Sequence, residues 1–302
     1  MLGAIIGDII NFKKISKSTL MSIEITKALI NGYGNEQSTE KEIMKIISKD
    51  FMPYGVSACA WLYNNLRDVE NYAELVAKTI SDNTDTIKEA KAIASSIFLA
   101  RMGANKEYIK EYVKDTYDLF ISFEDTLNQD NSSIVISEAY YGINDTLCKE
   151  ALNHLDKSSL DFLDYYNKTL SNLRNERISM MNKILDHKPY FDKKEIVRWL
   201  PTNNRKTPEF FADYGQEVND LIKVIHSPYF TDFKYVDTIR RLKITSFKEA
   251  IPTANMLGLR AMLTSITRRE RFGVGTISRA IVDGLISELL ERYKEILNDK
   301  NV

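Results

Sequence analysis

The 302-residue sequence predicts an all-α protein that consists of two helical domains. It contains 12 glycines and 6 prolines, so few positions are expected to end or kink a helix. Apolar residues recur at intervals of three and four over long stretches, which is the spacing of the buried face of a helix. No stretch alternates convincingly between apolar and polar residues, and no strand is therefore expected.

Composition and charge exclude several broad classes of protein. The sequence is 44% apolar and 27% charged, which is typical of a globular chain. Its formal net charge of -1 predicts no general attraction to nucleic acid. No apolar run approaches the roughly 20 residues of a membrane span. Residues 1–10 have no basic leader or cleavage site, so we expect a cytoplasmic protein that does not bind membranes.

The cysteines and histidines do not indicate a metal site. Cys59 and Cys148 lie in apolar stretches with helical spacing, and we expect both to be buried, reduced thiols. His154, His187 and His226 are far apart in the sequence and have no Cys or His at the spacing of zinc ligands. We interpret each histidine as a surface or interface residue.

The first part of the chain is expected to form a series of helices. Apolar residues 1–10 and residues 18–25 predict the first two helices. After a glycine-containing loop, Thr39 and Glu42 have the spacing of a capping box, which predicts a helix over residues 40–49.

The clearest helical pattern begins near residue 90. Alanines and larger apolar residues between 90 and 100 predict a helix whose small side chains let neighbouring helices approach closely. Gly103 is expected to end this helix, and the sequence Asn105-Lys106-Glu107 to begin the next one. Residues 145–173 predict further helices.

A change in composition predicts a domain boundary near residue 175. The following stretch contains three of the six prolines and an Asn-Asn turn, which favour irregular connections. We therefore predict a first domain over residues 1–172 and a second over residues 176–302.

Residues 1–172 resemble the ADP-ribosylglycohydrolase family. The opening MLGAIIGDII is similar to an apolar helix that ends in Gly-Asp at the family's magnesium site, and residues 80–118 resemble its central helix pair. The resemblance implies a related helical fold. In active members it also implies two magnesium ions held by oxygen ligands from distant parts of the chain.

The same resemblance implies that the metal ligands have been lost. Lys17 and Ser18 stand where the family has two aspartates, and residues 128–136 lack its second ligand motif. Asp8 and Asp130 are candidates for metal ligands that have been retained. We favour the alternative in which Asp8 is a helix-end residue and Asp130 is an acidic residue of a loop. A remnant pocket of these four residues would contain no metal, and Lys17 would pair there with the phosphate of a nucleotide such as ADP-ribose.

The C-terminal region resembles a second family, a bacterial domain of unknown function. The sequence LRAMLT from Leu259 and the sequence RRERF from Arg268 match the Leu-Arg-Ala-x-Leu-Thr and Arg-x-Glu-Arg-Phe motifs of that family. The resemblance implies no activity, because none is assigned to the family.

These motifs also predict a candidate site for an anion or a partner. Spacings of three and four place its residues along one helical face, and arginine is suited to bidentate capture of phosphate or carboxylate. The alternative is a structural network in which Glu270 and Asp283 pair with the arginines, and the sequence favours neither. The candidate residues are Arg260, Thr264, Arg268 and Arg271.

We predict that the protein is a catalytically inactive binding or regulatory module with no cofactor. Its expected partner is a protein or a nucleotide. One alternative is a residual magnesium-dependent hydrolase of ADP-ribosyl linkages. Another is a bacterial defence or phage counter-defence protein that binds a protein or sequesters a nucleotide signal.

Overall fold

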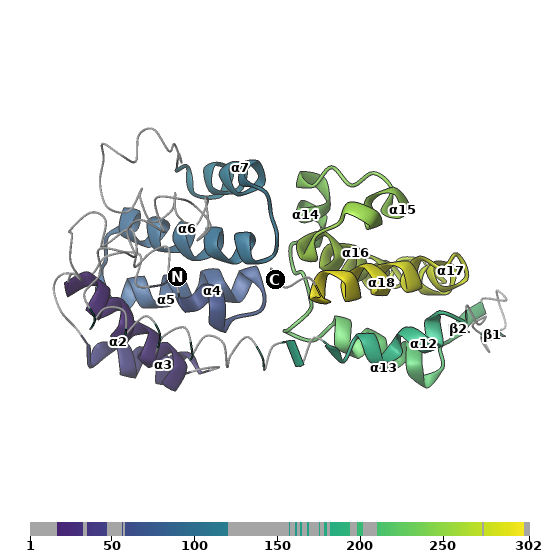
Figure 1. Cartoon of the computed structure of the whole chain (residues 1–302), viewed down its shortest axis with the longest axis horizontal. Helices are drawn as coiled ribbons and strands as arrows, with labels where there is room; N and C mark the ends of the chain where they lie inside the picture. Colours follow the sequence, from purple (N-terminus) through teal and green to yellow (C-terminus); the bar gives the residue numbers. More distant parts are fainter. Residues whose placement is uncertain are drawn as a thin grey trace. The chain divides into compact units, whose positions relative to one another are not determined.

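The computed structural model divides the chain into two compact units, residues 1–175 and 176–302 (Figure 1). Most of the described residues are helical, which confirms the all-α prediction. The described residues are 17–32, 35–46, 56, 58–119, 182–193, 198–201, 210–273 and 275–298, with isolated positions between 157 and 179.

In the N-terminal unit, α6 is covered by other helices. Helices α4, α5 and α7 contact it, and α5 does so most extensively. Ala90, Ala92 and Ala94 of α6 are fully buried, because their small side chains allow this close approach. The helices of this unit are α2 (Lys17–Asn31), α3 (Glu36–Met44), α4 (Cys59–Leu62), α5 (Leu66–Ile80), α6 (Thr84–Arg101) and α7 (Lys106–Tyr117).

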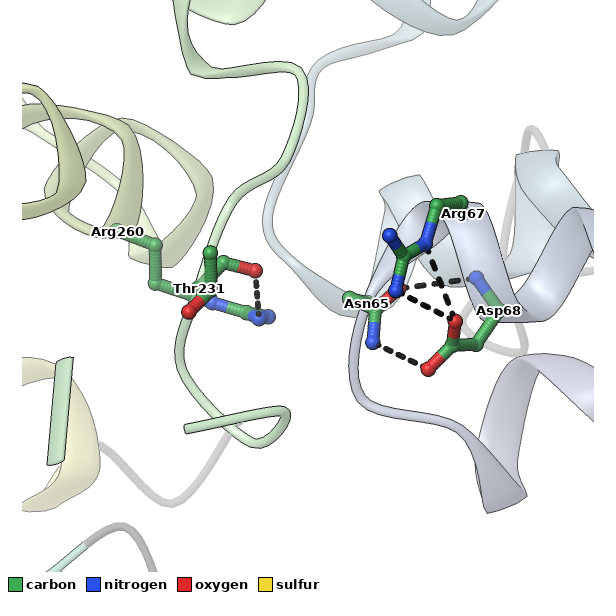
Figure 2. Close-up of polar contacts among 5 residues, drawn as sticks. All are labelled: Asn65, Arg67, Asp68, Thr231 and Arg260. Atoms are coloured by element: carbon green, nitrogen blue, oxygen red, sulfur yellow. Dashed lines mark hydrogen bonds and ion pairs between the residues drawn. The ribbon is translucent and has the colours of Figure 1, made fainter. Parts of the chain in front are cut away.

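Asparagine side chains cap four of these helices. Each accepts a hydrogen bond from a backbone N–H of the first turn, a group that otherwise has no partner in the helix. Figure 2 shows one example, in which Asn65 accepts from the N–H of Asp68 at 2.9 Å and its side-chain amide donates back to the Asp68 carboxylate at 2.7 Å. The predicted helix start after Asn105 is confirmed. The four caps are Asn35, Asn65, Asn83 and Asn105.

The capping box predicted at Thr39 is wrong. Helix α3 begins earlier, and Asn35 accepts from the N–H of Ser38 at 2.9 Å. Thr39 lies inside the helix, where its hydroxyl donates to the carbonyl of Gly32 at 2.9 Å. A Cβ atom on Gly32 would lie 2.4 Å from the Thr39 Oγ1 atom, so the glycine permits the close approach that buries Thr39.

A buried carboxylate links three helices of the N-terminal unit. Glu70 of α5 is 8% exposed, and it accepts hydrogen bonds from the hydroxyls of Tyr112 and Tyr117, the latter at 2.7 Å. Ser95 of α6 lies 2.9 Å from the Tyr117 hydroxyl. Burial raises the pKa of both tyrosines, so their hydroxyls keep the protons that they donate.

In the C-terminal unit, α16 occupies the centre. All residues from 256 to 267 are buried, and α13, α14, α17 and α18 contact this helix (Figure 1). The elements are η2 (Leu185–His187), α12 (Lys188–Phe191), β1 (Arg198–Pro201), β2 (Phe210–Asp213), α13 (Gln216–Ile225), α14 (Tyr235–Arg241), α15 (Phe247–Ala250), η3 (Ile251–Thr253), α16 (Met256–Arg269), α17 (Thr276–Val282) and α18 (Leu285–Asn298).

A short hairpin in this unit was not expected from the sequence. Strands β1 and β2 pair antiparallel, with Trp199 opposite Ala212 and Pro201 opposite Phe210. Each strand has four residues, which is too short for an alternating pattern to stand out from its surroundings.

Candidate anion site

Arg260 lies in the core of the C-terminal unit and not at its surface. The residue is 3% exposed, and its Nε atom donates to the carbonyl of Phe230 at 2.9 Å. Its Nη2 atom donates to the carbonyl of Thr231 at 3.3 Å, the contact drawn in Figure 2. Burial lowers the pKa of this guanidinium, and the nearby Asp232 carboxylate opposes that effect. Arg260 therefore holds the segment before α14 against α16.

Thr264 contributes to the same attachment. It is fully buried, and its Oγ1 atom accepts a hydrogen bond from the backbone N–H of Asp232 at 3.2 Å. The Asp232 carboxylate accepts from the N–H of Lys234 at 2.8 Å, and burial raises its pKa. Two of the four predicted site residues thus fasten one segment to the core, where an external ligand would not reach them.

Arg268 lies in the last turn of α16 and Arg271 lies just after the helix, and we call these two residues the arginine pair. Arg268 is half-buried, and its guanidinium carbon lies 5.6 Å from the ring centre of Phe233 and 5.7 Å from that of Tyr235. Arg271 is exposed in the turn that follows. In the part of the chain that the structure describes, neither guanidinium forms a hydrogen bond or an ion pair.

The aromatic contacts of Arg268 leave its hydrogen-bonding capacity available. A cation over a ring face is attracted by the ring without using any N–H group. Among the described residues, the five N–H donors of the guanidinium therefore have no protein acceptor, and an anion could use them while the rings hold the side chain in place.

His226 contacts the last turn of α16, the turn that carries Arg268. It is the C-cap residue of α13, and its Nε2 atom is 3.0 Å from the hydroxyl of Thr267, the residue before Arg268 on α16. The pKa of His226 is lowered by partial burial and then by the positive charges of Arg268 and Arg271. The charges of Arg268 and Arg271 therefore disfavour the protonated form of His226.

The alternative network of Glu270 and Asp283 is not formed by the described residues. Glu270 accepts hydrogen bonds from the backbone N–H groups of Gly275 at 2.7 Å and Ile277 at 2.8 Å. It therefore satisfies free donors at the start of α17 and pairs with no arginine. Asp283 is exposed at the C-cap of the same helix.

The predicted remnant pocket lies largely outside the described residues. Asp8 and Asp130 are not described, and Lys17 and Ser18 are placed only as the first two backbone positions of α2. Among the described residues, no group of three or more His, Cys, Asp or Glu side chains could hold a metal ion. Cys59 is a buried free thiol, as predicted, and burial raises its pKa.

The candidate site falls within a region that has recognisable relatives. Residues 181–299 match a family of unknown function, DUF6508. This confirms the similarity of the C-terminal region to a domain family without an assigned function. The DUF6508 match contains the whole arginine pair and His226, and it does not include residues 1–180. The resemblance of residues 1–172 to ADP-ribosylglycohydrolases therefore stays a prediction.

Other comparisons add no functional information. The chain matches no curated protein and no solved structure. In the described part of the chain, no helix is long and apolar enough to cross a membrane.

Sequence reasoning placed the arginines together but missed their neighbours. His226, Phe233 and Tyr235 precede Arg268 by more than thirty positions, and nothing in the sequence indicates that they pack against α16. Only the packing of α13 and α14 against α16 brings these side chains to the arginine pair.

Proposed function

We propose that this protein is a non-catalytic binding module that captures a phosphate-bearing ligand through Arg268 and Arg271. The observation that supports the proposal is that neither guanidinium has a hydrogen-bond or ion-pair partner within the described residues. Two arginines whose donors have no acceptor among the described residues favour an anion that offers several oxygen acceptors, and phosphate does so in a geometry that arginine matches.

A nucleotide with a diphosphate group is the ligand class that we favour. Its adjacent phosphates can engage two guanidiniums at once, whereas a single carboxylate offers two oxygens only. ADP-ribose, which the predicted resemblance of residues 1–172 implies as a ligand of that domain, is one such nucleotide to test at the arginine pair. A protein partner that carries phosphate groups would use the same two side chains.

Calorimetry with the full chain tests this proposal. ADP-ribose, ADP and inorganic pyrophosphate should each bind, with and without magnesium, because the arginine pair and not a metal supplies the positive charge. Replacing both arginines by alanine removes hydrogen bonds to a charged group that contribute about 1.5–3 kcal/mol each. Each arginine lost should therefore weaken binding by about 10-fold to 100-fold.

A neighbouring arginine provides the matched control. Arg269 is exposed, and its guanidinium carbon lies 5.8 Å from the ring centre of Phe247. Arg269→Ala should bind the three ligands as the unaltered protein does. Absence of binding at millimolar ligand, or equal losses in Arg269→Ala and in the double variant, would refute the proposed site.

A further inference from the structure

We propose that His226 is a third ligand of the bound anion and that binding takes up a proton at its ring, so that affinity increases as the pH falls. This inference rests on the proposed function of the arginine pair, and it adds a residue and a form of regulation to that site. It follows from the position, the tautomer and the electrostatic surroundings of His226.

The position of the histidine is determined by α16. Its Nε2 atom lies 3.0 Å from the Oγ1 atom of Thr267, and Arg268 is the next residue on the helix. The ring is therefore attached to the helix that carries the arginine pair, one residue before Arg268.

The hydrogen bonds of Thr267 indicate which nitrogen carries the proton. The Thr267 hydroxyl lies 3.1 Å from the carbonyl oxygen of Leu263 and 3.2 Å from that of Thr264, and it uses its single proton as a donor to these carbonyls. With the proton assigned in this way, the hydroxyl accepts from His226, and the N–H of the neutral ring is placed on Nε2. Nδ1 is left as the basic nitrogen that takes up the second proton.

In the free protein, the surrounding charges oppose protonation of the His226 ring. Arg268 and Arg271 both lower the pKa of His226, in addition to the effect of burial. On α13 itself, Asp220 pairs with Lys223 at 2.8 Å. Glu270 is engaged with the backbone at the start of α17, so it offers no compensating carboxylate.

A bound anion reverses the effect of the surrounding charges on the protonation of His226. Its negative charge offsets the two arginines and favours the imidazolium, which raises the pKa of His226 in the complex. A group whose pKa is higher in the complex makes binding tighter at low pH. This advantage is complete below the pKa of the free protein and is lost as the pH rises through the pKa of the complex. Each unit of difference between these two pKa values corresponds to a tenfold change in affinity.

Proton NMR of the full chain tests the inference directly. The chain has three histidines, and comparison with His226→Gln assigns the signals of His226. Sulfate and ADP-ribose are suitable probes, because neither changes its charge between pH 5.5 and pH 8, whereas a phosphate monoester titrates near pH 6. The free protein should show a pKa for His226 below the usual value of about 6.5.

Saturation with either probe should raise this pKa by at least one unit. For a shift of one unit, affinity should then be several-fold higher at pH 5.5 than at pH 8, approaching a limit of about tenfold at lower pH. His226→Gln should bind with little pH dependence, whereas Arg269→Ala should keep the dependence of the unaltered protein. Replacing both arginines by alanine should raise the pKa of His226 in the free protein.

Two results overturn the inference and leave the proposed function intact. One is binding through the arginine pair with no change in the pKa of His226. The other is a pH dependence that persists unchanged in His226→Gln. Failure of both probes to bind at any pH would instead overturn the proposed function together with the inference.

Discussion

Replacing the buried Arg260 by methionine should destabilise the C-terminal unit strongly. Methionine has a similar length and no donor, so the substitution leaves the carbonyls of Phe230 and Thr231 without their present partners in the core. An unpaired buried group costs about 1–3 kcal/mol, and breaking a buried charged contact costs about 3–5 kcal/mol. We therefore expect a loss of about 3–5 kcal/mol in the free energy of unfolding.

The assay must report on each unit separately. Hydrogen exchange followed by mass spectrometry in increasing urea gives the stability of peptides from α16 and α18 independently of those from α5 and α6. Arg260→Met should lower the protection of amides in α16 and α18 and leave that of amides in α5 and α6 unchanged. Arg260→Lys keeps a charge but has no fork that reaches two carbonyls, so about 1–3 kcal/mol should be lost.

Arg271→Met is the matched control, because the same chemical change is made at an exposed position. Its effect on stability should stay within about 0.5 kcal/mol. If Arg260→Met costs no more than Arg271→Met, Arg260 does not hold the core together and our interpretation of it is refuted.

Two further predictions concern the other polar contacts. The pKa values of Tyr112 and Tyr117 are raised in the folded state, so their contribution to stability is complete below about pH 10, the pKa of an unfolded tyrosine, and is lost above it. The urea concentration at the midpoint of unfolding should therefore fall as the pH rises above 10. It should fall less steeply in Tyr117→Phe. Absorbance of the native protein that shows both phenols ionised at pH 10 would contradict this prediction. Glu270→Ala should lower the stability of α17 by about 1–3 kcal/mol and speed its amide exchange, because two N–H groups lose their acceptor. Asp283→Ala should change neither the stability of α17 nor its amide exchange. Equal rates of amide exchange in the two variants would exclude capping of α17 by Glu270.

Local patterns predicted some elements well and others poorly. The alanine-rich helix, the stop at Gly103 and the start after Asn105 follow from short stretches of sequence, and the structure confirms each. The capping box at Thr39 failed because Asn35 offers a competing cap and Gly32 lets the threonine pack inward. Two caps with acceptable sequence signatures can be distinguished only by their contacts with the rest of the fold.

The same limit applies to the arginines. Spacing along α16 placed Arg260, Thr264, Arg268 and Arg271 on one face, but it contains no information about where the neighbouring helices end. The first two are buried by the segment before α14, whereas Arg268 is half-buried against Phe233 and Tyr235 and Arg271 is exposed in the turn after the helix. A helical face is therefore a weak basis for predicting a ligand site when the helix runs through a core.

The sequence by itself determined that this chain is helical, where several of its helices begin and end, and that its C-terminal region carries an arginine-rich motif. These properties depend on residues within a turn or two of each other. The tertiary structure alone decided that Arg260 stabilises the core, that Arg268 and Arg271 have no carboxylate partner among the described residues, and that His226 contacts the same helix at Thr267. Burial and electrostatic environment arise from residues that are distant in sequence, which is why no local pattern could have separated these two roles.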